Sequence, residues 1–278
     1  MSFVAKRKRV VKPEGKPEVD LGVYRLREWL QPECYAVAKE LLDKVMGKWL
    51  SLSLDEQSAA TRDVGFGNAL VKLAWNIVNT EVRYRYDADL FSQSDFWMMP
   101  SEVWAMKIGD CEDSSMLLAS TILRLFDVVG DFSYSWWQRL FAKDAPNCQV
   151  WIGFVKEGGF WYGHAWVAYC NPKYAFSKDW LILETTLESE VPMNLWIVWS
   201  KDIYLPVYLF NQFDSWRIDR DYGKLGLTKD YVDKHKNLID AMINYVEAGV
   251  KTPQKWVHKT IRPVKPEFRK VANKRWVG

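Results

Sequence analysis

Apolar residues in the first half of the chain recur every three to four positions, the spacing that places them on one face of a helix. Three segments show this pattern, at residues 32–50, 68–82 and 111–129. The third holds mainly apolar and small residues, which predicts a buried, central helix. We interpret the polar residues 51–62 as a link between the first two helices, and residues 84–100 as an aromatic, acidic loop.

The pattern changes beyond the third helix to short runs rich in aromatic and β-branched residues, which are typical of strands. We predict strands at residues 133–140, 148–155, 160–170, 180–186 and 195–199. Gly158 and Gly159 separate the second strand from the third, and glycine supplies the positive φ of a tight hairpin turn. Helices that come first and a mostly antiparallel sheet that follows predict an α+β fold.

One more helix is predicted near the C-terminus, because Thr228 can serve as its N-cap and Gly249 lies just past its end. Its spacing predicts exposed side chains at Lys229, Asp230, Asp233, Lys234 and Lys236. The same spacing predicts buried side chains at Tyr231, Leu238, Met242, Tyr245 and Val246.

Charge divides the chain into an acidic body and two basic ends. Residues 1–20 carry +3 and residues 251–278 carry +8, which leaves −8 for the middle of a chain whose net charge is +3. We therefore divide the chain into a basic arm (1–20), a core domain (21–225), a helix (226–249) and a second basic arm (250–278). Basic arms of this kind favour contact with an acidic protein surface, an assembly partner or nucleic acid.

Hydropathy and cysteine content indicate in which cellular compartment the protein is expected. No apolar run reaches the roughly 18 to 20 residues of a membrane-spanning helix, and residues 1–20 lack the apolar segment of a secretory signal. The four cysteines are too sparse for a disulfide scaffold and form no CxxC pair. We expect a cytoplasmic protein with reduced cysteines and no membrane partner.

Cys111 lies at the start of the third helix, in the sequence Gly-Asp-Cys-Glu-Asp. The unpaired N–H groups and positive dipole of a helix start favour a thiolate there, so Cys111 is a candidate nucleophile. Asp110 is a candidate N-cap, and its charge and those of Glu112 and Asp113 oppose the thiolate. A nearby imidazolium is therefore needed. The same acids could be read as a hard-cation site, but they lack the surrounding oxygen ligands of a calcium loop, so we expect no metal.

Two residues of the strand region could complete a site with Cys111. His164 stands on an alternating strand, and it is one of only three histidines in the chain. Glu184 is a single carboxylate within an apolar run on the next strand, where it needs a partner. A carboxylate that orients an imidazole would satisfy both residues.

These blocks resemble the transglutaminase-like superfamily of papain-like thiol enzymes, particularly its bacterial cysteine-proteinase branch. The resemblance rests on Gly-Asp-Cys-Glu-Asp at 109–113, His-Ala-Trp-Val at 164–167 and Glu-Thr at 184–185, in this order. Residues 74–87 and 95–102 are similar to the lead-in to the nucleophile, so the likeness covers about residues 65–190.

The resemblance implies a papain-like core and a triad in which Cys111 is the nucleophile, His164 the base and Glu184 the orienting acid. The family uses Asp more often at the third position. It implies an oxyanion hole built from the Cys111 backbone N–H and an upstream side chain, often a Gln where this chain has Met98. Trp97 and Gln93 are the candidates for the second donor.

Two functions of different class follow. The first is thiol-dependent acyl transfer from a protein or peptide substrate, as a cysteine peptidase, an amidase or a transglutaminase, without a cofactor. The second is an inactive or weakly active assembly protein of a large particle, such as a phage virion, that binds its partners through residues 1–20 and 250–278. Nucleic-acid binding by the arms is a third, weaker alternative, which predicts steep weakening with salt.

Overall fold

The computed structural model describes residues 4–6, 23–25, 30, 36–62, 64–87, 89, 97–129, 147–171, 179–193 and 195–247. The strand predicted at 133–140, the candidate donor Gln93, Gly249 and the arm at 250–278 lie outside these residues. Of the arm at 1–20, only β1 (Val4–Lys6) is described, and it pairs antiparallel with β2 (Val23–Arg25). Within the described residues, no helix is both long enough and apolar enough to cross a membrane.

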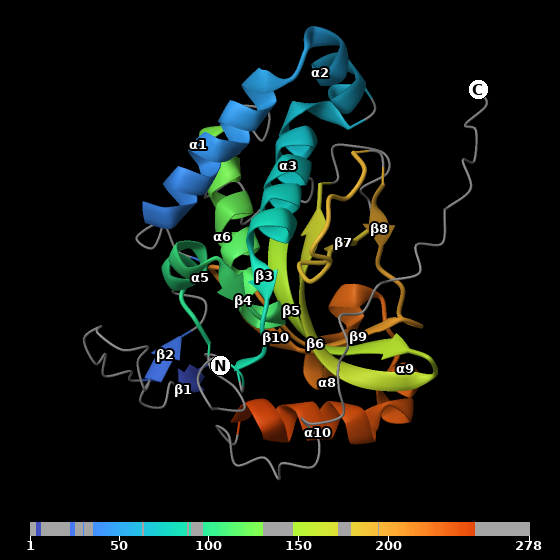
Figure 1. The fold of residues 1–278 in the computed structure, drawn as a ribbon. Helices are drawn as coiled ribbons and strands as arrows, with labels where there is room; N and C mark the ends of the chain where they lie inside the picture. Colours follow the sequence, from blue (N-terminus) through green and yellow to red (C-terminus); the bar gives the residue numbers. More distant parts are fainter. Residues whose placement is uncertain are drawn as a thin grey trace, which may run out of the picture.

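Three helices form one layer, with α6 (Cys111–Val128) packed against α1 (Ala36–Ser51) and α3 (Gly65–Glu81) (Figure 1). They match the three helices predicted from apolar spacing. Most of α6 is buried, because α1, α3 and α5 (Pro100–Met106) cover one side of it and strands β5 and β6 the other. The helix that carries Cys111 is therefore central, as predicted.

The second layer is a six-stranded antiparallel sheet in the order β10-β9-β5-β6-β7-β8. Its strands are β5 (Asn147–Glu157), β6 (Phe160–Cys170), β7 (Leu181–Leu183), β8 (Ile197–Val198), β9 (Tyr204–Phe210) and β10 (Ser215–Arg217). Gly158 and Gly159 turn β5 into β6 with φ of 56° and 87°, so the predicted hairpin is confirmed. The predicted α+β class is confirmed as well.

The two faces of the sheet have different environments. Ala165, Val167 and Tyr169 of β6 belong to the large apolar core that includes the helices. Trp166 and Ala168, which alternate with them, belong to a second cluster on the opposite face. That cluster also contains Trp151, Val155, Ile182, Tyr204 and Leu209, with Trp180, Trp199 and Trp216 packed against it. Much of the tryptophan content of the chain is thus structural.

Several predicted boundaries are wrong. The segment 51–62 is no simple link, because it contains α2 (Leu54–Thr61), whose N-cap Ser53 forms a capping box with Glu56. The strands predicted at 180–186 and 195–199 shorten to β7 and β8, and sequence patterns did not predict α5, β9 or β10. Two further short helical turns, α8 (Ile218–Asp221) and η5 (Tyr222–Leu225), follow β10.

The C-terminal helix is divided in two, α9 (Lys229–Lys234) and α10 (Lys236–Glu247), because His235 leaves helical geometry with ψ of 11°. Thr228 is the N-cap, since its side chain accepts a hydrogen bond from the Tyr231 N–H. All five side chains predicted to be exposed are exposed. Of those predicted to be buried, Met242 is buried and the other four are half-buried, while the buried positions also include Val232, Ile239 and Ile243.

Gly153 occupies an irregularity in the pairing of β5 with β9, where the register shifts between Ile152 and Gly153. A Cβ atom at Gly153 would lie 2.1 Å from the Leu205 carbonyl oxygen, and this oxygen belongs to backbone that cannot swing aside. We expect Gly153→Ala to lower the free energy of unfolding by about 3 kcal/mol, measured by urea denaturation. Gly47→Ala is the control. Gly47 lies in α1, and a Cβ atom there would meet no neighbouring atom within 4 Å, so this substitution should be neutral or stabilising. Equal stability of Gly153→Ala and the unsubstituted protein would contradict the prediction.

Candidate functional site

The start of α6 is held by a short parallel pairing between β3 (Arg83–Tyr84) and β4 (Ile108–Gly109). Gly109 is needed here, because a Cβ atom would lie 2.9 Å from the Cβ of Asp113. Asp110 occupies the N-cap position, as predicted, but its side chain makes no capping hydrogen bond. Its carboxylate instead lies close to those of Asp87 and Asp113. Cys111 is therefore the first residue of the helix.

The Cys111 thiol is half-buried and hydrogen-bonds to Glu112 Oε2 at 3.0 Å. Burial raises the pKa of this thiol well above its usual range, and the Glu112 and Asp110 carboxylates raise it further. The backbone N–H of Ala165, which also hydrogen-bonds to the sulfur, acts in the opposite direction. Burial and the neighbouring acids together thus outweigh the hydrogen bond from Ala165, and this thiol holds its proton more tightly than an ordinary cysteine does.

His164 and Glu184 form a buried pair, with 2.8 Å between His164 Nε2 and Glu184 Oε2. Burial alone would raise the pKa of Glu184, but the His164 ring and hydrogen bonds from Thr186 outweigh it and hold this pKa below its usual range. Glu184 Oε1 accepts both the hydroxyl of Thr186 at 2.9 Å and its backbone N–H at 3.3 Å. Glu184 therefore remains a carboxylate next to the imidazole.

The segment that carries Glu184 is fixed to the helical layer. The Glu184 carbonyl accepts hydrogen bonds from Trp75 Nε1 at 2.6 Å and Asn79 Nδ2 at 3.0 Å, both on α3. The hydroxyls of Ser115 on α6 and Thr185 are 3.2 Å apart. These contacts fix the backbone of Glu184 and Thr185 against the helical layer. Sequence reasoning missed these residues, and no local signal identifies them, since they meet Glu184 across long stretches of chain.

Cys111 and Glu184 each contact a different one of two consecutive residues of β6, Ala165 and His164. Glu184 contacts His164 directly, and the Cys111 sulfur contacts the backbone of Ala165, the residue after His164. Among the described residues, the hydrogen bond of the thiol goes to Glu112 and not to His164. Because Nε2 of His164 faces Glu184, Nδ1 is the ring nitrogen left for another group. Trp166 stacks on the ring at a centroid distance of 5.9 Å.

The candidate oxyanion donors are only partly described. Trp97 is half-buried and packs against the same core as Cys111, whereas Gln93 lies outside the described residues. Met98 cannot help through its backbone, because its N–H donates to Asp113 Oδ1 at 2.7 Å. The Cys111 N–H lies in the first turn of α6, where amides have no partner within the helix.

Tyr84, the last residue of β3, and Tyr86, just after it, were not predicted to belong to the site. Burial raises the pKa of Tyr84 and of Tyr86, and a charge on Cys111 raises both further. Their rings pack edge to face at a centroid distance of 5.1 Å. Both hydroxyls therefore stay protonated near the thiol. The aromatic character of residues 84–100 was visible in the sequence, but nothing assigned it to the nucleophile.

A cluster of acids lies next to the thiol. Carboxylate oxygens of Asp87, Asp110 and Asp113 come within 4.8 Å of one another, and Cys111 and Glu112 form an overlapping group with Asp110. Burial, together with the neighbouring carboxylates, raises the pKa of Asp110. Oxygen ligands in this arrangement suit a hard divalent cation. From the sequence we expected no metal, because Asp110, Glu112 and Asp113 lack further oxygen ligands. The structure adds the carboxylate of Asp87, which follows β3, to this group.

Comparison with solved structures finds matches of low similarity to this chain. Solved structures of Legionella pneumophila LapG, including an EGTA-treated form and a calcium-bound form, share 18% sequence identity with this chain at TM-scores of 0.36 to 0.37. The alignments cover 72% of this chain and 97 to 98% of LapG. No protein-family model and no curated protein matches the sequence. No role of any residue follows from a structural likeness of this size.

Proposed function

We propose that this chain is a thiol-dependent acyl-transfer enzyme, a cysteine peptidase, amidase or transglutaminase, with Cys111, His164 and Glu184 as its triad. The observation that carries the proposal is the buried His164–Glu184 pair, 2.8 Å apart, whose histidine is next in sequence to Ala165, the residue of β6 that the Cys111 sulfur contacts. Nucleophilic catalysis requires a thiol, a base that takes its proton and a third group that orients the base, and Glu184 is placed to orient the His164 imidazole.

The geometry supports a general-base mechanism rather than a resting thiolate–imidazolium pair. Because the pKa of Cys111 is raised, its proton leaves only when a base takes it at the moment of attack. Nε2 of His164 donates to Glu184, so Nδ1 would accept the proton from Sγ while sulfur bonds to the acyl carbon. His164 would then give this proton to the leaving amine, and a thioester would remain.

The second half-reaction restores the enzyme. Water or an amine adds to the thioester carbonyl, His164 takes its proton, and the C–S bond breaks as sulfur regains a proton from His164. The Cys111 N–H would stabilise the oxyanion in both halves, with Trp97 or Gln93 as the second donor. The nature of the acceptor, water or an amine, separates a hydrolase from a transglutaminase.

An activity test with two readouts examines the proposal. We expect the protein to release peptides from casein or to incorporate dansylcadaverine into it, and Cys111→Ala to abolish whichever activity is present. Cys170→Ala is the matched control, since Cys170 is also half-buried but lies at the far end of β6, and it should retain full activity. Activity that survives in Cys111→Ala would refute the proposal.

The raised pKa of Cys111 also favours a second candidate, an inactive module that acts in the assembly of a larger particle. In this case residues 1–20 and 250–278 would bind an acidic protein surface or nucleic acid. A chain without residues 250–278 should then stay folded but no longer enter the assembly. Binding to nucleic acid would weaken steeply as salt increases.

A further inference from the structure

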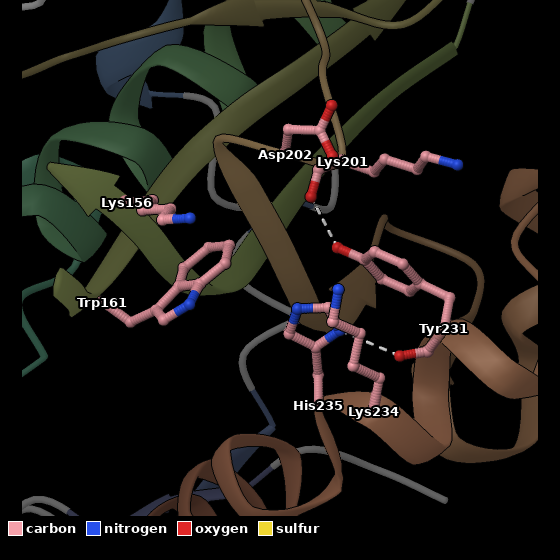
Figure 2. A pocket seen from close by; sticks show the side chains of 7 residues that line it. All are labelled: Lys156, Trp161, Lys201, Asp202, Tyr231, Lys234 and His235. Atoms are coloured by element: carbon pink, nitrogen blue, oxygen red, sulfur yellow. Dashed lines mark hydrogen bonds between the residues drawn. The ribbon is translucent and has the colours of Figure 1, made fainter. Parts of the chain in front are cut away.

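A pocket of about 420 Å³ is lined by residues other than those proposed for catalysis (Figure 2). Its walls come from the β5–β6 hairpin, the turn before β9, and α9 with its C-cap residue. The lining residues are Lys156, Trp161, Lys201, Asp202, Tyr231, Lys234 and His235. None of them takes part in the proposed acyl transfer, and Trp161 stands three positions before His164 on β6.

The pocket has an excess of positive charge. Lys156, Lys201 and Lys234 are exposed, and within the described part of the chain none of them forms an ion pair. Asp202 is the single carboxylate among the lining residues. Three ammonium groups against one carboxylate give a net charge that a dianion would balance, and a shared wall focuses their field on the ligand.

Three rings make the rest of the wall. Trp161 and His235 meet edge to face at a centroid distance of 5.8 Å, and His235 and Tyr231 lie 4.4 Å apart. Lys156 Nζ is 5.7 Å from the Trp161 ring, and Lys201 Nζ is 5.9 Å from the Tyr231 ring. Cations thus stand beside aromatic surface, which suits a ligand with an anionic end and a planar, apolar end.

Hydrogen bonds fix the rings in place. The Tyr231 hydroxyl donates to the Lys201 carbonyl at 2.6 Å, and Nδ1 of His235 lies 2.9 Å from the Tyr231 carbonyl. A carbonyl only accepts, so His235 carries a proton on Nδ1 and its Nε2 is the nitrogen that can respond to a ligand. Figure 2 shows both contacts as dashed lines.

We propose that this pocket binds a small dianion attached to a planar apolar group, of which an aromatic phosphate monoester is the simplest example. The ammonium groups of Lys156, Lys201 and Lys234 hold the phosphate, and Trp161, Tyr231 and His235 contact the ring. The pocket can bind its ligand whether or not Cys111 is active, since no residue is shared.

Nuclear magnetic resonance of the histidine side chains tests this proposal directly, because the chain has only three histidines. Titration of the full chain with phenyl phosphate should shift the His235 Cε1–H resonance, while the His164 resonance stays in place. Phenol should not bind, and inorganic phosphate should bind at least about tenfold more weakly than phenyl phosphate. His235→Gln assigns the resonance.

Substitutions separate the two halves of the site. The double variant Lys201→Met/Lys234→Met should weaken phenyl phosphate binding about tenfold or more, and Lys229→Met, an exposed lysine of the same helix outside the pocket, should change it less than about twofold. Trp161→Leu should reduce the affinity for phenyl phosphate to that for inorganic phosphate. Equal affinities for the two phosphates in the unsubstituted protein, an unmoved His235 resonance, or unchanged binding by the double lysine variant would each overturn the proposal.

Discussion

Alanine in place of His164 should slow the alkylation of Cys111 by iodoacetamide at neutral pH by about 100-fold. Burial and the Glu112 and Asp110 carboxylates raise the pKa of this thiol, so very little thiolate forms without help. His164 is the only base that we propose for it, and Glu184 keeps that base oriented. Rates are measured by mass spectrometry of the Cys111 peptide after timed exposure to reagent.

Two internal standards make the alkylation result interpretable. His235→Ala removes the other histidine of the described residues, which lies outside the proposed triad, and should leave the Cys111 rate unchanged. Cys170, whose pKa burial raises to about 11 with a smaller contribution from Asp179, reports general thiol exposure in every sample. Equal Cys111 rates in His164→Ala and the unsubstituted protein would show that the imidazole is not the base. The inactive-module candidate would then stand.

The three candidate residues of the site could be predicted because each one lies in a short, recognisable sequence motif. Cys111 begins α6 and His164 lies on β6 as their local patterns require, and Glu184 was found because a carboxylate within an apolar run needs a partner. The contacts that hold Glu184 could not be predicted, since Trp75 and Asn79 lie more than 100 positions away in the sequence. Only the packing of α3 against the sheet brings them there.

The direction of the Cys111 pKa also depended on the structure. The sequence shows the acids on either side of the thiol but not its burial, which is the largest cause of the raised pKa. It also does not show that Asp87 joins Asp110 and Asp113. The position of Cys111 at a helix start would by itself predict a lowered pKa, whereas the pKa of this thiol is raised.

Elements without a clear apolar period were missed for identifiable reasons. Helix α2 buries no residue, so it has no apolar stripe, although its Ser-x-x-Glu start was a readable capping signal. Strand β9 is apolar throughout and contains Pro206, and a proline argues against a strand in the interior of a sheet. The structure places Pro206 opposite Gly153, next to the register shift, where a missing N–H is tolerated. Helix α5 has only 7 residues, too few to show a period.

The burial of Lys72 also could not be predicted from the sequence, because a lysine in the middle of a helix normally faces solvent. In α3 it is fully buried, its ammonium group donates to the Leu195 carbonyl, and it lies 4.0 Å from the Trp75 ring and 4.9 Å from the Trp196 ring. Burial lowers the pKa of Lys72 from its ordinary value of 10.5 to about 7. The folded protein therefore gives up this proton far more readily than the unfolded chain does.

Replacing Lys72 with methionine should for this reason change how stability depends on pH. Between about pH 7 and 10.5 the unfolded chain holds a proton that the folded state has lost, so a rise in pH stabilises the unsubstituted protein by about 1.4 kcal/mol per pH unit. Lys72→Met lacks this contribution. Its free energy of unfolding, measured by urea denaturation, should exceed that of the unsubstituted protein at pH 7 and lose this advantage at that slope up to pH 9.

Lys72→Met must be compared with the unsubstituted protein at each pH. The buried cysteines, whose pKa is raised, destabilise the fold as pH rises, and they do so equally in both proteins. Lys39→Met, at an exposed position of α1, is the control and should show no pH-dependent difference. If the difference between Lys72→Met and the unsubstituted protein does not vary from pH 7 to pH 9, Lys72 stays charged in the folded state. The rings of Trp75 and Trp196 would then hold an ammonium ion that burial alone would have neutralised.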